Sequence, residues 1–216
     1  MQGHYRSVSY GASLPDMTLL IATRNRGKFA EIAEALVALH LDLRGGFDFP
    51  DIPDCPEGTE SYEANAVAKA LHYSKAAGLP ALADDSGIEV AALAGAPGVL
   101  SARFGGEGLT DADRNRKLLE ALRGIPEDNR QGRYVAVVAL AFHGKIAGTF
   151  RGEAKGILLR EPRGANGFGY DPLFYYPDLH LTFAQMLPAV KRQVSHRGKA
   201  LALACDALRR QGELLS

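Results

Sequence analysis

The amino-acid sequence predicts an α/β fold in which helices pack on a mixed β-sheet. Three observations support this. An unbroken apolar run at 18–23 is followed directly by helical periodicity. Helical and strand-like segments then alternate as far as Leu122. Finally, strand-like runs at 133–142 and 145–153 flank His143-Gly144, a turn of hairpin length, which adds an antiparallel pair to the sheet.

The elements of the first part of the chain follow from local patterns. TLLIAT (18–23) has the continuous apolar character of a buried strand. Apolar residues at helical spacing predict a helix over 27–39. A second helix is predicted over 61–77, because Ser61 is a good N-cap. A short strand over 81–83 should lead into the acidic sequence DDSG.

The later elements are predicted in the same way. Thr110 and Asp113 have the spacing of a capping box, so a helix should start there and run to about Leu122. The hairpin follows, and then a long loop over 162–172. A closing helix is predicted over 196–210.

No linker divides the chain, and we therefore expect residues 17–216 to form a single α/β domain. The polar residues 1–16 are expected to be a disordered N-terminal extension, an upstream start or an addition made for expression. Met17 would serve as an alternative start. These residues contain no apolar segment typical of a signal peptide.

The composition excludes several classes of protein. Lys plus Arg and Asp plus Glu are both 25 in 216 residues, and this zero balance argues against a nucleic-acid polymer as partner. No run is apolar enough to cross a membrane, so we expect a cytoplasmic protein. Cys55 and Cys205 are far apart and have no metal-binding spacing; reduced thiols are favoured over a disulfide.

The first candidate site segment is TRNRGK, formed by Thr23, Arg24, Asn25, Arg26, Gly27 and Lys28. It lies where the first predicted strand meets the first helix. Such a turn presents free backbone N–H groups and the positive end of the helix dipole, which together attract anions. The basic side chains strengthen this attraction, although the segment lacks the P-loop pattern and, considered alone, is a solvated helix start.

The second segment contains the adjacent carboxylates Asp84 and Asp85, followed by Ser86. Two neighbouring carboxylates repel each other unless a cation or hydrogen-bond donors compensate them. At a phosphate site Mg²⁺ is the natural cation, with Glu57 as a possible further ligand. One of the two aspartates could instead accept a proton from attacking water. An ordinary Asp-Ser-Gly turn is the alternative.

Two further segments carry aromatic and basic residues. Phe168, Gly169, Tyr170 and Asp171 combine flat faces with a flexible backbone, which suits stacking on a base; equally, the two rings could cap the core. The second of these segments is the basic group Lys191, His196 and Arg197. Its last two residues would lie in the first turn of the closing helix, where cations oppose the helix dipole unless they meet an anion or a ligand.

Taken together, these segments resemble the inosine triphosphate pyrophosphatase family, whose members act on non-canonical purine nucleotides. The matching motifs occur in the family's order along nearly all of the chain from Met17. They are TRNRGK (23–28), EGTESYEANA (57–66), DDSGIEV (84–90), GAPGVLSARFGG (95–106), GFGYDP (167–172) and SHRGKAL (195–201). Each motif is weak alone, but six in order are specific.

The resemblance implies an elongated α/β fold with a mixed sheet and two lobes around a central cleft, in a homodimer. It implies Mg²⁺-dependent hydrolysis of ITP, dITP or XTP to the monophosphate and pyrophosphate. Asp85 would be the general base and would lie near the metal, with Glu57 and Asp84 as further metal-associated carboxylates. The other matched positions would bind substrate: Thr23 to Lys28 the triphosphate, Ser86 an unspecified part, and 168–171, Lys191, His196 and Arg197 the purine.

The sequence departs from the family pattern at two places. Arg24 stands where the family usually has a small residue, so it either alters the phosphate-binding turn or adds a cation to it. SYEANA replaces the more usual TFxENA, which displaces a carboxylate to Glu63.

Two other functions remain open. A pyrimidine or modified-nucleotide pyrophosphatase of the same architecture would normally begin with a different motif, of S-x-S-P-R-R type. A nucleotide sensor without turnover would have little use for the paired carboxylates. Both are therefore ranked below the purine enzyme.

Overall fold

The computed structural model describes residues 17–213, and the predicted extension 1–16 lies outside this range. The strands are β1 (Thr18–Ile21), β2 (Asp42–Gly45), β3 (Ala81–Val90), β4 (Gln131–Phe142), β5 (Lys145–Leu158), β6 (Phe174–Tyr176) and β7 (Leu181–Thr182). The α-helices are α1 (Arg26–Leu36), α2 (Tyr62–Ala77), α3 (Asp111–Ala121), α4 (Pro188–Val194) and α5 (His196–Glu213). Short 3₁₀ turns connect several of these elements.

The strands form one sheet in the order β2-β1-β3-β4-β5-β6-β7. β1 pairs in parallel with β2 and β3, whereas β6 pairs antiparallel with β5 and β7. This confirms the predicted α/β class with a mixed sheet and flanking helices. In the described part of the chain no helix has the length and apolar character needed to cross a membrane.

The chain forms two compact units. Of the described residues, unit 1 comprises 17–85, 137–151 and 199–213, and unit 2 comprises 86–136 and 152–198. Strands β3, β4 and β5 and helix α5 each begin in one unit and end in the other. A single domain over 17–216 stays a prediction.

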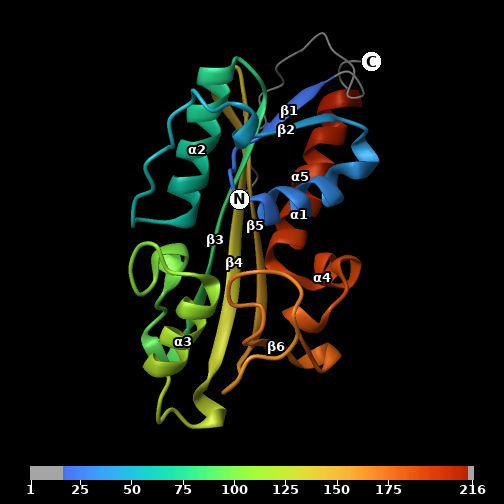
Figure 1. Ribbon diagram of the computed structural model, residues 1–216. Helices are drawn as coiled ribbons and strands as arrows, with labels where there is room; N and C mark the ends of the chain where they lie inside the picture. The colour runs from blue at the N-terminus through green and yellow to red at the C-terminus, as the bar shows by residue number, and fades with distance from the viewer. Residues whose placement is uncertain (1–16, 214–216) are drawn as a thin grey trace. The chain divides into compact units, whose positions relative to one another are not determined.

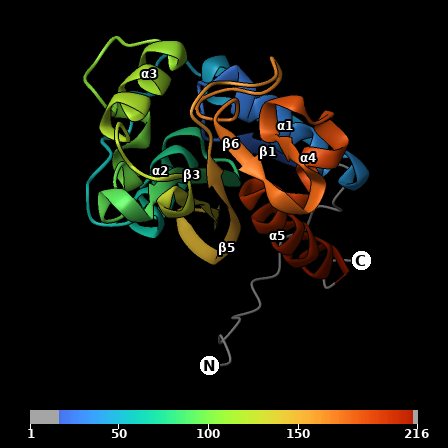
Figure 2. The same cartoon turned by 90° about the horizontal axis from the view of Figure 1, so that it is seen from below.

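Within unit 1, helices lie on both sides of the strands (Figure 1). Helices α1 and α5 lie side by side, where the thiol of Cys205 donates to the carbonyl of Ala35 at 3.6 Å. Helix α2 lies on the opposite side of β1 and β3, as the second view also shows (Figure 2). β1 is almost completely buried, as its unbroken apolar sequence predicts.

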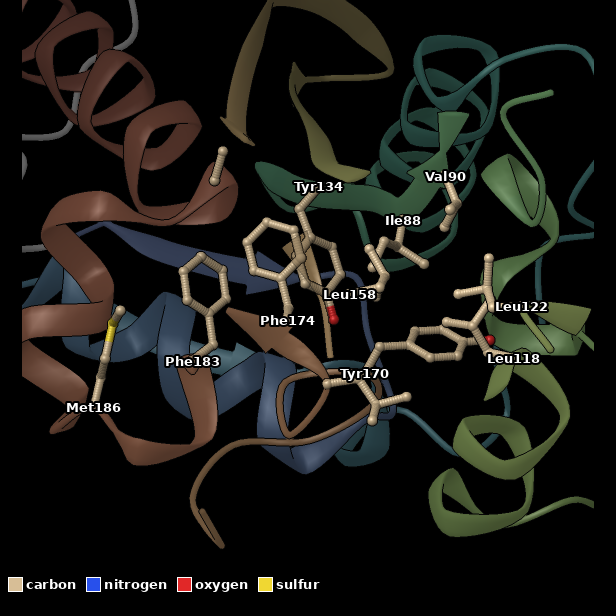
Figure 3. Close-up of a cluster of buried hydrophobic side chains, with 12 residues drawn as sticks. Ile88, Val90, Leu118, Leu122, Tyr134, Leu158, Tyr170, Phe174, Phe183 and Met186 are labelled. Carbon is tan, nitrogen blue, oxygen red and sulfur yellow. The ribbon is translucent and has the colours of Figure 1, made fainter. Parts of the chain in front are cut away.

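Unit 2 has its own hydrophobic core, built from the end of β3, from β4 to β6, from α3 and from the loops between them (Figure 3). The rings of Tyr134 and Phe174 lie 4.7 Å apart at its centre, and Phe183 packs 4.7 Å from Phe174. Tyr170 enters the same cluster beside Leu118 and Leu122. This core fixes the base of the loop that contains GFGYDP.

Local signals predicted several boundaries correctly. Ser61 caps α2 by accepting from the N–H of Ala64, and the Thr110–Asp113 capping box starts α3. His143 and Gly144 adopt the positive φ angles, 46° and 70°, of a tight hairpin turn. The strand predicted from Ala81 is present, but its predicted end was wrong, because β3 continues through DDSG to Val90.

Candidate functional site

The turn between β1 and α1 is organised by its own polar side chains. Asn25 caps α1, its Oδ1 accepting from the N–H of Lys28 at 2.9 Å. The N–H of Asn25 in turn donates to Oγ1 of Thr23 at 3.2 Å. Two of the predicted phosphate-binding residues therefore shape the turn, and Gly27 lies in the first turn of the helix that follows.

The three cations of this turn lie in different surroundings. The ammonium of Lys28 is 3.0 Å from the buried carboxylate of Asp84. The guanidinium of Arg26 lies 4.4 Å above the ring of Phe47, which is a cation–π contact. Arg24 contacts the loop that follows Phe49, where its guanidinium donates to the carbonyl of Ile52. Lys28 is thus the cation of this turn that pairs with one of the two adjacent aspartates, Asp84.

The two adjacent aspartates lie inside β3, so their side chains leave the strand on opposite faces. Asp84 pairs with Lys28 from α1. Asp85 contacts two side chains of α2, on the other side of the strands: it accepts from the ammonium of Lys69 at 3.1 Å and from the amide of Asn65 at 3.0 Å. Each carboxylate therefore has its own lysine, and these two cations offset the repulsion between them.

Lys69 and Asn65 were missed by the sequence analysis. They are four residues apart on α2 and therefore lie on one face of the helix. Lys69 also donates to Glu57 at 2.8 Å, while Asn65 donates to the carbonyl of Gly58 and accepts from its N–H. Their spacing places them on the same face of the predicted helix as its apolar residues, and these polar residues on an apolar face are the signal that could have identified them.

Burial and the neighbouring charges alter two pKa values here. Burial raises the pKa of the Asp85 carboxyl above its ordinary value, and the charges of Lys69 and Lys28 oppose this only in part. For Lys69, burial lowers the pKa, but the carboxylates of Asp85, Glu57 and Asp84 outweigh it and the net pKa is raised. Lys69 therefore stays an ammonium, and Asp85 is more basic than an ordinary aspartate.

The carboxylates of Glu57 and Asp85 suit a hard divalent cation. Both approach the same ammonium of Lys69, so their oxygens are directed at one region, whereas Asp84 is directed at Lys28. Within residues 17–213 no group of three or more acidic, His or Cys residues is arranged to hold a metal ion. Magnesium in phosphate sites commonly uses one or two carboxylates with phosphate oxygens, and the pair fits that requirement.

In unit 2, Arg197 connects the start of α5 to Ser86. Its Nη2 donates to the hydroxyl of Ser86 at 2.8 Å. Ser195 caps α5, since its hydroxyl accepts from the N–H of Gly198 at 3.1 Å, as the sequence predicted. Arg197 and His196 are both only 3% exposed, although they carry polar groups in the first turn of a helix.

The ring of His196 is held by an aromatic stack. It lies parallel to the ring of Tyr134, with centroids 4.4 Å apart and an interplanar angle of 4°. The ring of Phe183 is also parallel to it, at 6.4 Å. The stack fixes the plane of the imidazole and therefore the direction of its two nitrogens.

The GFGYDP loop is closed by Asp171. Its Oδ2 accepts from the N–H of Phe168 at 3.0 Å and from the ammonium of Lys191 at 2.6 Å. Lys191 and Arg197 also lie 5.2 and 5.4 Å from the centre of the Phe168 ring. Gly167 has a φ of 74°, and a Cβ there would lie 2.1 Å from Oδ2 of Asp171, so this position requires glycine.

The two aromatic residues of this loop have different environments. Phe168 is half-buried, whereas the ring of Tyr170 is buried in the core and its hydroxyl donates to the carbonyl of Ser101 at 2.8 Å. For Tyr170 the structure thus matches the core-capping interpretation. Two residues of α3 that the sequence analysis missed fix the backbone between them: Asp111 accepts from the N–H of Gly169, and Asn115 donates to its carbonyl.

The predicted site residues therefore form two groups. Thr23 to Lys28, Glu57, Asp84 and Asp85 belong to unit 1, and Ser86, 168–171, Lys191, His196 and Arg197 to unit 2. In class, this is an α/β protein whose paired carboxylates lie inside β3, just beyond the end of its parallel pairing with β1, and are compensated by lysines from α1 and α2.

Comparison with known proteins identifies the family. Residues 19–207 match the Ham1 family, and the chain belongs to it. It is 46% identical to the dITP/XTP pyrophosphatase of Geobacter sulfurreducens over 90% of this chain and 98% of that protein. It is 47% identical to a protein of the same name from Thermus thermophilus, over 90% of this chain and 93% of that protein.

Solved structures give the same result. The structure of a HAM1 protein from Coxiella burnetii matches with a TM-score of 0.81 and 40% identity, over 90% of this chain and 99% of that one. The Ham1 protein of Staphylococcus aureus matches with a TM-score of 0.79 and 34% identity over the same shares.

Proposed function

We propose that this protein is a nucleoside-triphosphate pyrophosphatase that hydrolyses ITP, dITP and XTP to the monophosphate and pyrophosphate. The observation that carries the proposal is the arrangement around Asp85: a buried carboxylate of raised pKa, held by Lys69 and Asn65, beside the Lys28–Asp84 pair. The names of the curated relatives, dITP/XTP pyrophosphatase, support the choice of substrate.

Hydrolysis requires a water molecule activated as a nucleophile and positive groups that offset the negative charge of the triphosphate. Asp85 accepts a proton from water directed at the α-phosphorus, and its raised pKa favours this transfer. Lys28 and the N-terminus of α1 bind the phosphates, in the turn that Thr23 and Asn25 shape. Lys69 holds the Asp85 carboxylate in place.

A magnesium ion completes this part of the proposal. Glu57 and Asp85 would hold it together with phosphate oxygens, and Asp84 would stay near it as the partner of Lys28. When bound, the ion supplies positive charge that neutralises the phosphate oxygens.

Unit 2 supplies the residues proposed to recognise the base. His196 and Arg197 are donors suited to the 6-oxo group of hypoxanthine and xanthine, and Phe168 offers a flat face for stacking. Adenine has a 6-amino donor at this position, so two donors would face each other and binding would weaken. Five further residues of unit 2 would contact the substrate or hold His196, Arg197 and Phe168 in place. They are Ser86, Gly169, Tyr170, Asp171 and Lys191.

The experiment is to incubate the protein with ITP, dATP, dGTP and dTTP in the presence of Mg²⁺ and to identify the products. Pyrophosphate and monophosphate formed preferentially from ITP would support the proposal. Preferential cleavage of dTTP would instead indicate a pyrimidine enzyme, and nucleotide binding without products would indicate a sensor. We further propose that the protein acts in the cytoplasm, as a homodimer.

A further inference from the structure

Arg24 forms a bridge between two loops of unit 1. Its Nη2 donates to the carbonyl of Ile52 at 2.6 Å, and its Nε lies 3.1 Å from the carboxylate of Asp54. Arg24 itself belongs to the turn between β1 and α1, whereas its two partners belong to the segment 50–60 that precedes α2. This segment also carries Glu57, so one guanidinium joins the predicted phosphate-binding turn to the loop of a predicted metal ligand.

Side chains hold the segment 50–60 along its length. His72 contacts the carbonyl of Pro53 at 2.7 Å, and the amide of Asn65 hydrogen-bonds to both backbone groups of Gly58. Lys69 binds Glu57 at 2.8 Å. These three residues belong to α2, which follows the segment in the chain. Arg24 attaches the same segment to an earlier part of the chain, the turn that also contains Lys28.

The geometry of Arg24 favours a structural bond over a free cation. Two different nitrogens of the guanidinium form contacts at the same time, which is possible because its N–H donors lie in one fixed plane. Ile52 is 8% exposed, so its carbonyl gains from a charge-assisted hydrogen bond in a partly buried position. The ion pair with Asp54 is more exposed, because the side chains of Arg24 and Asp54 are 41% and 77% exposed. It therefore contributes less to stability than the hydrogen bond to Ile52.

We infer that Arg24 is a positioning residue, which fixes the spacing between the triphosphate-binding turn and the loop that carries Glu57. A small side chain at this position could not reach Ile52, so the bridge depends on the arginine. The inference rests on the proposed function for its effect on catalysis, while the bridge itself is a property of the folded chain. In this role Arg24 acts on the substrate through Glu57 and Lys28 rather than by binding phosphate directly.

The kinetic test uses Arg24→Ala, Arg24→Lys, Asp54→Ala and the double variant Arg24→Ala/Asp54→Ala, assayed with ITP and Mg²⁺. We expect Arg24→Ala to lower kcat about tenfold, because small displacements of positioned groups are costly. Arg24→Lys should be equally impaired, since the single ammonium of lysine cannot reproduce the two contacts that different guanidinium nitrogens make. Asp54→Ala should have a smaller effect and add nothing in the double variant.

The matched control is Arg44→Ala, because Arg44 forms an exposed ion pair with Asp42 on β2 of the same unit. Its kcat and KM should equal those of the wild type. A different outcome would overturn the inference: Arg24→Ala raising KM with kcat unchanged, while Arg24→Lys keeps the wild-type KM. That pattern would show a direct phosphate contact, which needs only the charge.

Hydrogen exchange of the nucleotide-free protein tests the bridge without any assumption about the substrate. Amides in the segment 50–60 should exchange about tenfold faster in Arg24→Ala and Arg24→Lys than in the wild type, and those of α3 should not change. Unchanged exchange in 50–60 would refute the bridge. If exchange accelerates but no nucleotide is cleaved even by the wild type, the proposed function fails and the bridge stands.

Discussion

At the scale of single residues, the proposed chemistry depends on how strand geometry separates two neighbouring carboxylates. Asp84 and Asp85 are consecutive in β3, and each is compensated by a lysine from a different helix. The arrangement keeps two charges in a buried position while leaving one of them, Asp85, with a raised pKa. The lysines also bring positive charge to the place where phosphate is proposed to bind.

Asp85→Asn should lower kcat on ITP by about 10²- to 10⁴-fold, because it removes the proposed general base. The amide has nearly the same shape, and Lys69 keeps its contact with Glu57, so we expect the fold to survive. Steady-state kinetics and circular dichroism would measure both effects. Asp42→Asn, an exposed substitution on β2, should leave turnover unchanged. Wild-type activity in Asp85→Asn would remove Asp85 from the mechanism.

Lys28→Ala should mainly weaken binding of the triphosphate. The substitution removes the cation beside Asp84 and so leaves a buried carboxylate near the incoming phosphates. We expect KM to rise by about tenfold or more, with a smaller change in kcat. The comparison variant is Lys145→Ala at the exposed start of β5. An unchanged KM in Lys28→Ala would contradict its role.

At the scale of secondary-structure elements, many of the proposed site residues lie at or next to the N-terminal ends of helices. The capping box at the start of α3 fixes the helix whose Asp111 and Asn115 hold Gly169. Similarly, Asn25 starts α1 at the turn proposed to bind phosphate, and Ser195 starts α5 at His196. Short polar side chains thus determine where three site segments begin.

The capping box predicts a pH-dependent contribution to stability. Hydrogen bonds from the hydroxyl and N–H of Thr110 lower the pKa of the Asp113 carboxyl below its ordinary 3.8. Its stabilisation is therefore present above that ordinary value and is lost as the pH falls through the lower value in the folded protein.

Asp113→Asn should accordingly lower Tm at about pH 7, and the difference should shrink as the pH falls below 3.8 and the carboxyl of the folded protein becomes protonated. Thermal melts of both proteins across this range would measure the difference. Glu120→Gln, an exposed change on the same helix, should show no such trend. A Tm difference that persists unchanged at the lowest pH would contradict the proposed capping contribution.

The corner between α4 and α5 depends on one glycine. A Cβ on Gly198 would lie 1.7 Å from the carbonyl oxygen of Arg192, so the two helices can approach only because this side chain is absent. Gly198→Ala should destabilise the protein by about 1–3 kcal/mol, as overpacking does. Urea denaturation would measure it. Leu203→Ala, at a half-exposed position of α5, should cost much less, and equal effects would argue against the close approach.

At the scale of the whole molecule, the two units are interleaved along the chain. The boundary falls between Asp85 and Ser86, so consecutive residues of one strand belong to the two groups of proposed site residues. Asp85 is held by α2 in unit 1, and Ser86 is held by Arg197 in unit 2. A fixed peptide bond thus links the proposed general base to a residue of the proposed substrate-binding group.

The internal lysine pairs make a prediction about metal removal. Because Lys28 and Lys69 already compensate Asp84 and Asp85, the fold should not need a metal ion for its stability. Chelation by EDTA should abolish turnover of ITP, because the proposed catalysis requires Mg²⁺, and excess Mg²⁺ should restore it. The Tm of the nucleotide-free protein should change little on chelation. A large fall in Tm on chelation would show that the ion is part of the folded structure.

The sequence determined features that depend on neighbouring residues. Ser61, Thr110 and Asp113 marked helix starts because capping bonds span only three residues. His143-Gly144 marked the hairpin for the same reason, and the ordered motifs indicated the family.

Tertiary structure alone decided features that depend on distant partners. It extended β3 through DDSG, formed the short strands β2, β6 and β7, and paired each aspartate with its lysine. It also placed Arg24 on Ile52, a contact across 28 residues of chain. Such contacts form because burial and hydrogen bonding with remote segments outweigh local propensity, and a linear pattern does not contain the partner's position.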